Sequence, residues 1–199
     1  RLGSDGAWQA WLRHLQIEVA PLVPSNCGFD VSVGYRKGWS EHLSTRFAGE
    51  PLKSVVLTCT RTQGQTFTRK GEMVITEHGI EGSLVYAASS LLRDEIAHTG
   101  HAQLTLNLRP EFTADRVLAE VRHPRGSRSL SSHLKSRLNL QPVHLALLHE
   151  VLTKEALTDP VQLANAIQNL PITVVATRPL DEAISSGGGV KLEALDDVL

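Results

Sequence analysis

The chain has 199 residues, with 20 basic and 21 acidic side chains, so its formal net charge is −1. This length can bury a sizeable core, and the balanced charge gives no overall field that would select a polyanionic partner. No apolar run approaches the roughly 20 residues that span a bilayer, and the polar N-terminus does not resemble a signal peptide. We therefore expect a cytoplasmic protein with no membrane partner.

The two cysteines, Cys27 and Cys59, are isolated in the sequence. Neither belongs to a C-x-x-C pair, so we expect two buried free thiols in a reducing compartment. Aromatic residues make up only 5% of the chain. The core should therefore consist mainly of Leu, Val, Ile and Ala.

The two ends of the sequence also carry information. The chain opens Arg1-Leu2-Gly3 without an initiator methionine, and its only methionine is Met73. It stops at Asp197-Val198-Leu199, without a polar tail. From these ends we expect a fragment of a larger protein.

The first 110 residues predict a β-rich structure with a few helices. Alternating apolar residues mark the strands, the Thr62–Gln65 segment is a turn signal, and apolar residues at helical spacing mark the helices. Gly79 and Gly82 suggest a close backbone approach, and Gly100 suits the position after a helix end. The predicted elements are, in order, a helix at 8–15, an extended crossing through Pro21 and Pro24, a strand at 29–33, a short helix at 40–47, strands at 52–60, 66–68 and 73–76, a helix at 84–96 and a strand at 102–108.

After Pro110 the apolar period becomes helical and predicts four helices. The first begins at Thr113, the second carries Leu130, Leu134 and Leu138, the third begins at Pro142, and Asp159-Pro160 starts the fourth. Residues 172–177 return to β character. The fold class is therefore α+β, in which a β-rich part at 26–110 and 171–184 encloses a helical subdomain at 111–170.

No known catalytic motif is present. The sequence lacks G-x-G-x-x-G, a Walker motif, H-E-x-x-H and G-x-S-x-G. His98 and His101 have a metal-like spacing, but Gly100 breaks the helix that would aim both rings together. Asp181 and Glu182 are adjacent and point to different sides, so they do not form a shared-proton pair. We predict neither a catalytic residue nor a metal site.

One segment is strongly basic, because no Asp or Glu occurs between Val121 and His149. Its simplest interpretation is a solvated face balanced by acids elsewhere. The alternative is binding of nucleic acid, and of RNA rather than DNA, because no DNA-reading motif is present. No aromatic platform for base stacking accompanies the cations. The candidate nucleic-acid-binding residues are Arg122, Arg125, Arg128, Lys135 and Arg137.

Three consecutive glycines, Gly187, Gly188 and Gly189, remove every Cβ from one point near the end of the sequence. Glycine weakens an ordinary strand, so such a run suits a backbone that lies against something bulky. Only nine residues follow Val190. We therefore expect the contact partner of these glycines to lie outside this sequence, the alternative being a flexible tail.

Several segments together resemble one family, the bacterial FAD-dependent flavoproteins of the BaiN-like, NAD(P)/FAD-dependent oxidoreductase type. The resemblance runs from end to end of the chain, and the ordered set is specific although each segment alone is weak. It rests on residues 1–8 (RLGSDGAW), 24–29 (PSNCGF), 47–53 (FAGEPLK), 71–82 (GEMVITEHGIEG) and 178–184 (RPLDEAI), followed by the Gly-Gly-Val at 188–190.

In that family a domain resembling a β-barrel with a helical subdomain is inserted into the FAD-binding domain. The resemblance implies that residues 1–25 and 185–199 are stubs leading from and to that domain. It places Gly188, Gly189 and Val190, with Gly3 and Ser4, near the flavin. FAD would belong to the parent protein and would not be held by this chain alone, and NAD(P)H is the implied electron donor.

The resemblance implies a positioning role. FAD carries the redox chemistry, while the inserted domain excludes water and caps or recognises a substrate whose ring double bond is reduced. Some relatives are similar to enzymes that reduce small molecules, others to enzymes that form dihydrouridine in ribosomal RNA, and a purely structural or dimerising domain is a further alternative. Glu81 replaces a small hydroxyl residue of the family pattern, which indicates a subfamily difference.

Overall fold

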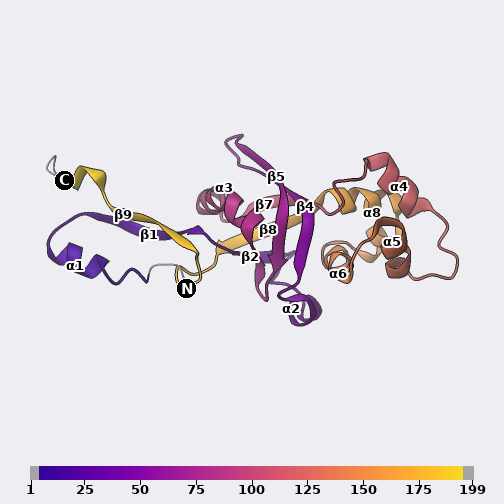
Figure 1. Ribbon diagram of the computed structural model, residues 1–199, viewed down its shortest axis with the longest axis horizontal. Helices are drawn as coiled ribbons and strands as arrows, with labels where there is room; N and C mark the ends of the chain where they lie inside the picture. Colours follow the sequence, from indigo (N-terminus) through magenta and orange to yellow (C-terminus); the bar gives the residue numbers. More distant parts are fainter. Residues whose placement is uncertain (1–4, 195–199) are drawn as a thin grey trace.

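The computed structural model describes residues 5–194. Figure 1 shows an elongated molecule with three parts in a row, namely a two-stranded ribbon, a β-barrel and a cluster of helices. We call the last two the barrel and the helical lobe. None of the helices within residues 5–194 is long and apolar enough to cross a membrane.

Six antiparallel strands form a closed barrel. The sheet order is β2-β6-β5-β4-β7-β8, and β8 pairs with β2 to close it. The short strand β3 (Arg36–Lys37) extends β2 as a hairpin. The barrel strands are β2 (Phe29–Val33), β4 (Pro51–Thr60), β5 (Thr66–Ile75), β6 (Gly79–Glu81), β7 (Ala102–Asn107) and β8 (Leu170–Thr177). The predicted α+β class with a barrel-like part is therefore confirmed.

Gly79 allows two barrel strands to meet. A Cβ at this position would lie 2.0 Å from the main-chain oxygen of Phe29 on β2, a separation that no real side chain tolerates. The predicted close approach at Gly79 is thus confirmed. Gly82 has φ = 102° at the start of the next helix, a conformation that favours glycine.

The barrel encloses an aliphatic core. Phe29, Met73 and Ile75 are fully buried, and α3 (Ser83–Thr99) packs on the barrel through Leu84, Val85, Ala88 and Leu92. Cys27 and Cys59 are both buried and free, as expected. Burial raises the pKa of the Cys59 thiol to about 11. Both cysteines therefore act as small core hydrophobes.

The helical lobe lies between β7 and β8 in the chain. Side-chain caps begin four of its helices, from Thr113, Ser129, Thr153 and Asp159. The five-residue helix α7 was not predicted, because it is too short to show an apolar period. The lobe consists of α4 (Ala114–Arg122), α5 (Leu130–Leu138), α6 (Pro142–Val151), α7 (Lys154–Thr158) and α8 (Pro160–Gln168).

Glu150 on α6 ties the lobe to the barrel side. Its carboxylate accepts hydrogen bonds from the backbone N–H of Ser40 at 2.7 Å and from the Ser40 hydroxyl at 2.6 Å. Arg36 on β3 forms an ion pair with the same carboxylate, and the Glu150 side chain is only 5% exposed. Ser40 also caps α2 (Glu41–Phe47). This cluster thus links α6 to both β3 and the start of α2 through polar contacts.

The ribbon joins the two ends of the described chain. Strand β1 (Val19–Asn26) pairs antiparallel with β9 (Ser185–Val190), and Val19 lies opposite Val190. Helix α1 (Gln9–His14) precedes β1, and a 3₁₀ turn at Leu192–Ala194 follows β9. None of the residues in α1, β1 or β9 is buried. The ribbon has no core of its own.

Candidate functional site

The glycine strand is the first candidate site, and its geometry corrects one expectation. Gly188 and Gly189 have φ of 92° and 125°, values that side chains rarely adopt. A Cβ on Gly188 would lie 2.2 Å from the main-chain oxygen of Pro21 on β1. The expectation that the contact partner of these glycines lies outside this sequence is therefore wrong for Gly188, because β1 runs directly beside it.

The remaining predicted flavin-facing residues are only partly placed. Val190 ends β9 opposite Val19, and the nearest atom to a Cβ on Gly189 would belong to Trp8, at 3.8 Å. Gly3 and Ser4 lie outside the described residues, as does Leu2, which we expected near Val190. The pairing of β1 with β9 still brings the two ends of the described chain together, as insertion into another domain would require.

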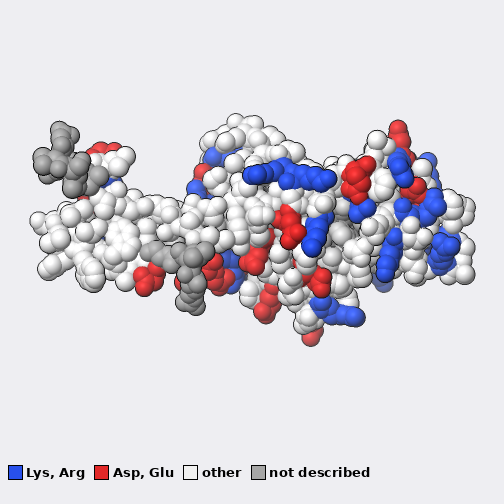
Figure 2. Space-filling model, viewed as in Figure 1, with Lys and Arg blue, Asp and Glu red and all other residues white. Residues whose placement is uncertain are grey.

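The ribbon and the short segments next to its strands, including α1 and the 3₁₀ turn, expose large apolar side chains. Trp11, Leu15 and Leu192 are 75%, 66% and 79% exposed, and Val23 and Ile184 are also exposed. In Figure 2 the visible face of the ribbon carries few charged side chains. Elsewhere in the described chain, the strongly exposed large hydrophobics are Tyr35 and Val161. The exposed large apolar side chains are thus concentrated on the ribbon and the segments beside it.

Arg178 fixes the point where the chain leaves the barrel for the ribbon. Its guanidinium donates to both carboxylate oxygens of Glu182 at 2.8 Å and to Asp30 Oδ1 on β2, also at 2.8 Å. Glu182 is therefore engaged in a structural ion pair. Among residues 5–194, no three His, Cys, Asp or Glu side chains gather in a way that could hold a metal ion.

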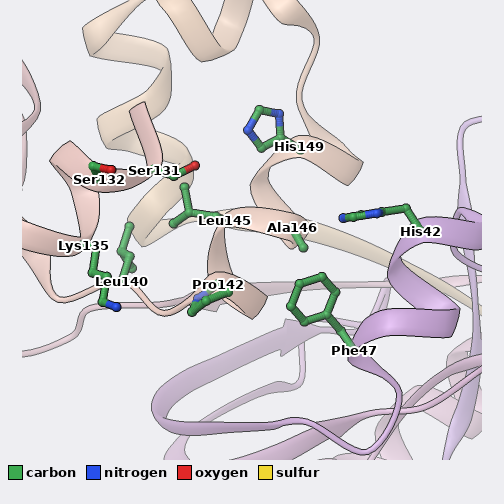
Figure 3. Close-up of a pocket in the computed structure, with 10 residues that line it drawn as sticks. All are labelled: His42, Phe47, Ser131, Ser132, Lys135, Leu140, Pro142, Leu145, Ala146 and His149. Atoms are coloured by element: carbon green, nitrogen blue, oxygen red, sulfur yellow. The ribbon is translucent and has the colours of Figure 1, made fainter. Parts of the chain in front are cut away.

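Two cavities that share His149 are lined by residues of the helical lobe, and the smaller one is also lined by α2. Figure 3 shows the smaller one, of about 420 Å³, where Phe47 and His42 on α2 face Ala146 and Pro142 on α6. Its far side is formed by α5, which contributes Ser131, Ser132 and Lys135.

The larger cavity has about 640 Å³ and an apolar floor. Val121, Leu157 and Leu163 contribute to that floor. Its cationic lining residues are Arg122, Arg125 and Lys154, with His123 and His149 beside them. This combination suits an organic molecule with an apolar body and an anionic group.

The five basic residues predicted to bind nucleic acid do not lie on one common surface. Arg122 and Arg125 line the larger cavity, and Lys135 lines the smaller one. Arg137 is paired with Glu120 on α4, so its charge is already neutralised. Arg128 lies in the exposed turn before α5, with no ion-pair partner within residues 5–194. A continuous basic stripe is therefore not formed by all five.

The sequence matches a protein-family model over most of its length. The family model described as HI0933-like protein barrel and H2TH domain matches residues 23–185. The matched range covers the barrel, the helical lobe and the second half of β1, and it ends at the first residue of β9. No curated protein matches the chain.

Proposed function

Because the chain belongs to the family of HI0933-like barrel and H2TH domains, we propose that it is the substrate-positioning insert of an FAD-dependent oxidoreductase of BaiN-like type. The HI0933-like proteins are flavoproteins, which supports FAD as the cofactor of the parent protein. The insert lacks a dinucleotide fingerprint, so FAD would be held by the domain on which the ribbon docks. In this proposal NAD(P)H supplies the electrons, and FAD passes them to a ring double bond.

One observation carries this proposal, namely the apolar, coreless ribbon. Two-stranded ribbons are marginally stable alone in water, and the short helices at the two ends of this one present Trp11, Leu15 and Leu192 to solvent. Contact with a neighbouring domain would bury these side chains and would stabilise the ribbon by about 25 cal/mol for each Å² removed from water. Gly188 and Gly189 would then lie at that contact, consistent with backbone close to the flavin.

The helical lobe would recognise the substrate rather than cover the flavin directly. In Figure 1 the ribbon and the lobe lie at opposite ends of the molecule, with the barrel between them. A flavin beside Gly188 would therefore be far from the lobe in this arrangement. Binding of a remote part of the substrate can still position its reacting part, and the cavity of about 640 Å³ beside Arg122 and Arg125 is suited to that role.

RNA is a second candidate for the molecule that the lobe recognises. The turn that connects α4 and α5 places Arg125 and Arg128 in exposed positions without ion-pair partners in the described chain. A large anionic substrate would also explain a recognition lobe that is distant from the flavin. The separation of Lys135 and the pairing of Arg137 with Glu120 weigh against a broad RNA-binding face.

A docking experiment tests the proposal. Hydrogen exchange of the β1 and β9 amides would be measured in the 199-residue chain and in the full-length flavoprotein that contains it. We expect strong protection only in the flavoprotein, together with stoichiometric FAD. Replacing Trp11 and Leu15 by Asp should reduce both protection and FAD retention, whereas Tyr35→Asp, at an exposed position on the barrel side, should change neither.

Two outcomes would contradict the proposal. One is tight, stoichiometric uptake of FAD by the 199-residue chain alone, since the proposal assigns FAD binding to another domain. The other is wild-type protection of β1 and β9 in a flavoprotein carrying Trp11→Asp and Leu15→Asp. A purely structural or dimerising domain would instead bury the ribbon against a second copy of the chain, which sedimentation of the isolated chain would detect.

A further inference from the structure

A polar cavity of about 440 Å³ lies where the barrel meets the helical lobe, apart from the two cavities described above. The barrel contributes Lys53 on β4 and Lys70 on β5. Arg109 and Glu111, in the link between β7 and α4, form another side, and His144 on α6 lines the cavity from the lobe. Three different parts of the chain thus deliver polar side chains to one place.

A β-bulge shapes the barrel side of this cavity. The pairing of β4 with β5 shifts register between Leu52 and Val55, so Lys53 and Ser54 form an irregularity in the strand. Ser54 adopts φ = 58°, which is uncommon for a residue other than glycine. Bulges change the direction in which side chains point, and both residues of this bulge line the cavity.

His144 contributes a hydrogen-bond donor without an acceptor. Its side chain is almost completely buried, and its Nδ1 accepts a hydrogen bond from the backbone N–H of Gln141 at 3.0 Å. The ring proton must therefore reside on Nε2, which is buried and has no partner in the described part of the chain. Burial, followed by the nearby charge of Arg109, lowers the pKa of His144 to about 4, so the ring is neutral at pH 7.

The cations around the cavity outnumber the acids. Arg109 forms an ion pair with Glu111, the one carboxylate that lines the cavity. Lys53 and Lys70 have no ion-pair partner within residues 5–194. Figure 2 shows Lys and Arg side chains over the strands β4 and β5, next to the lobe. Two uncompensated ammonium groups therefore face the same space.

We propose that this cavity binds the phosphate group of a small molecule, with Lys53, Lys70 and Arg109 supplying charge and His144 Nε2–H supplying a directed hydrogen bond. A buried N–H without an acceptor is destabilising, because it has lost its hydrogen bond to water, and a phosphate oxygen would provide that acceptor. Phosphate can accept several hydrogen bonds at once, which matches the mixture of ammonium, guanidinium and imidazole donors. This site is independent of the proposed docking to an FAD-binding domain.

Titration of the 199-residue chain with inorganic phosphate tests the site directly. Calorimetry at constant ionic strength, with chloride as the balancing anion, should show saturable binding. The double variant Lys53→Met, Lys70→Met should weaken binding by at least about tenfold, because contacts to charged groups are lost. Lys37→Met, which removes a cation on the β2–β3 hairpin that lines none of the three cavities, should leave it unchanged.

The His144 contribution needs a variant that still folds. His144→Asn keeps an acceptor for the Gln141 N–H while removing the Nε2–H donor. It should weaken phosphate binding, and the ring Nε2–H of the wild type should shift in ¹H–¹⁵N spectra as phosphate is added. Absence of phosphate-specific binding by the wild type would overturn the proposal, as would wild-type affinity in the double lysine variant.

A competition experiment identifies which kind of molecule carries the bound phosphate group. A small phosphomonoester should displace inorganic phosphate from the site. If a single-stranded RNA oligonucleotide instead occupies the site and excess phosphomonoester fails to displace it, the assignment to a small molecule is wrong.

Discussion

The barrel and the ribbon are built from the same antiparallel pairing but are stabilised differently. In the barrel, β8 returns to β2, so the sheet has no open edge and encloses a buried core. The ribbon has two strands and no buried residue, and large apolar side chains remain exposed on and beside it. Closure makes the barrel self-sufficient, whereas the ribbon depends on a surface that covers it.

Gly79 in the barrel and Gly188 in the ribbon illustrate this difference. A Cβ on Gly79 would meet the main-chain oxygen of Phe29 at 2.0 Å, and one on Gly188 would meet that of Pro21 at 2.2 Å. The local steric requirement is almost the same. What differs is the cost of moving the neighbouring strand, which is high in a closed barrel and low in a ribbon.

The largest effect is expected for Gly79→Ala. The added methyl group can be accommodated only if β2 and β6 separate, which would open the barrel and destabilise the fold by on the order of 4 kcal/mol. Urea unfolding followed by circular dichroism would measure this loss. Gly64→Ala is the matched control, because its Cβ would meet nothing within 4 Å and only its positive φ costs about 1 kcal/mol. Equal losses in the two variants would contradict the argument.

The free energy of unfolding should depend on pH through His144, which lies where the barrel meets the lobe. The folded-state pKa of His144 is lowered from 6.5 to about 4, so the unfolded chain binds a proton more readily. The contribution of neutral His144 to the free energy of unfolding is then complete above about pH 6.5. It decreases by roughly 3 kcal/mol as the pH drops to about 4. Urea midpoints between pH 7 and 4 should show this slope in the wild type and lose it in His144→Asn. His149→Asn, at an exposed position on the same helix, should keep it.

Glu150→Ala tests whether the lobe relies on the barrel side. The substitution leaves the Ser40 backbone N–H, the Ser40 hydroxyl and Arg36 without their shared acceptor. We expect a loss of about 2 kcal/mol, the value typical of hydrogen bonds to a charged group. Increased amide exchange in α6 should accompany it. Glu50→Ala, at an exposed position, should be nearly neutral, and the same result for Glu150→Ala would show that packing alone fixes the lobe.

Most of the local structure was predictable because it depends on nearby residues. Caps such as Thr113 and Asp159 satisfy the first backbone N–H groups of their helices, and the strict alternation at 102–108 specifies a strand with one buried face. Barrel closure was not predictable from spacing, because it depends on β2 pairing with β8, about 140 residues away along the chain. The resemblance to a known family supplied it.

The candidate sites were harder to predict because they depend on distant pairs. The local sequence does not predict that Gly188 lies against Pro21, or that Glu120 pairs with Arg137. The residues of the proposed phosphate site share this property, since Lys53, Arg109 and His144 come from three separate segments. Only the tight connection between α5 and α6 at residues 139–142 is encoded locally. Asn139 ends α5 in a left-handed conformation, Pro142 begins α6, and Asn139 and Gln141 line the cavity.

The smallest effect on global stability is expected for Gly188→Ala. The ribbon contributes nothing to the buried core, so the urea midpoint of the barrel should change by less than about 0.5 kcal/mol. Locally the methyl group cannot coexist with the Pro21 oxygen, so β9 must move away from β1 and their amides should exchange faster. A large loss of global stability would mean that the ribbon and the barrel unfold as one unit. That result would contradict the view that the barrel is self-sufficient and that only the ribbon depends on a partner.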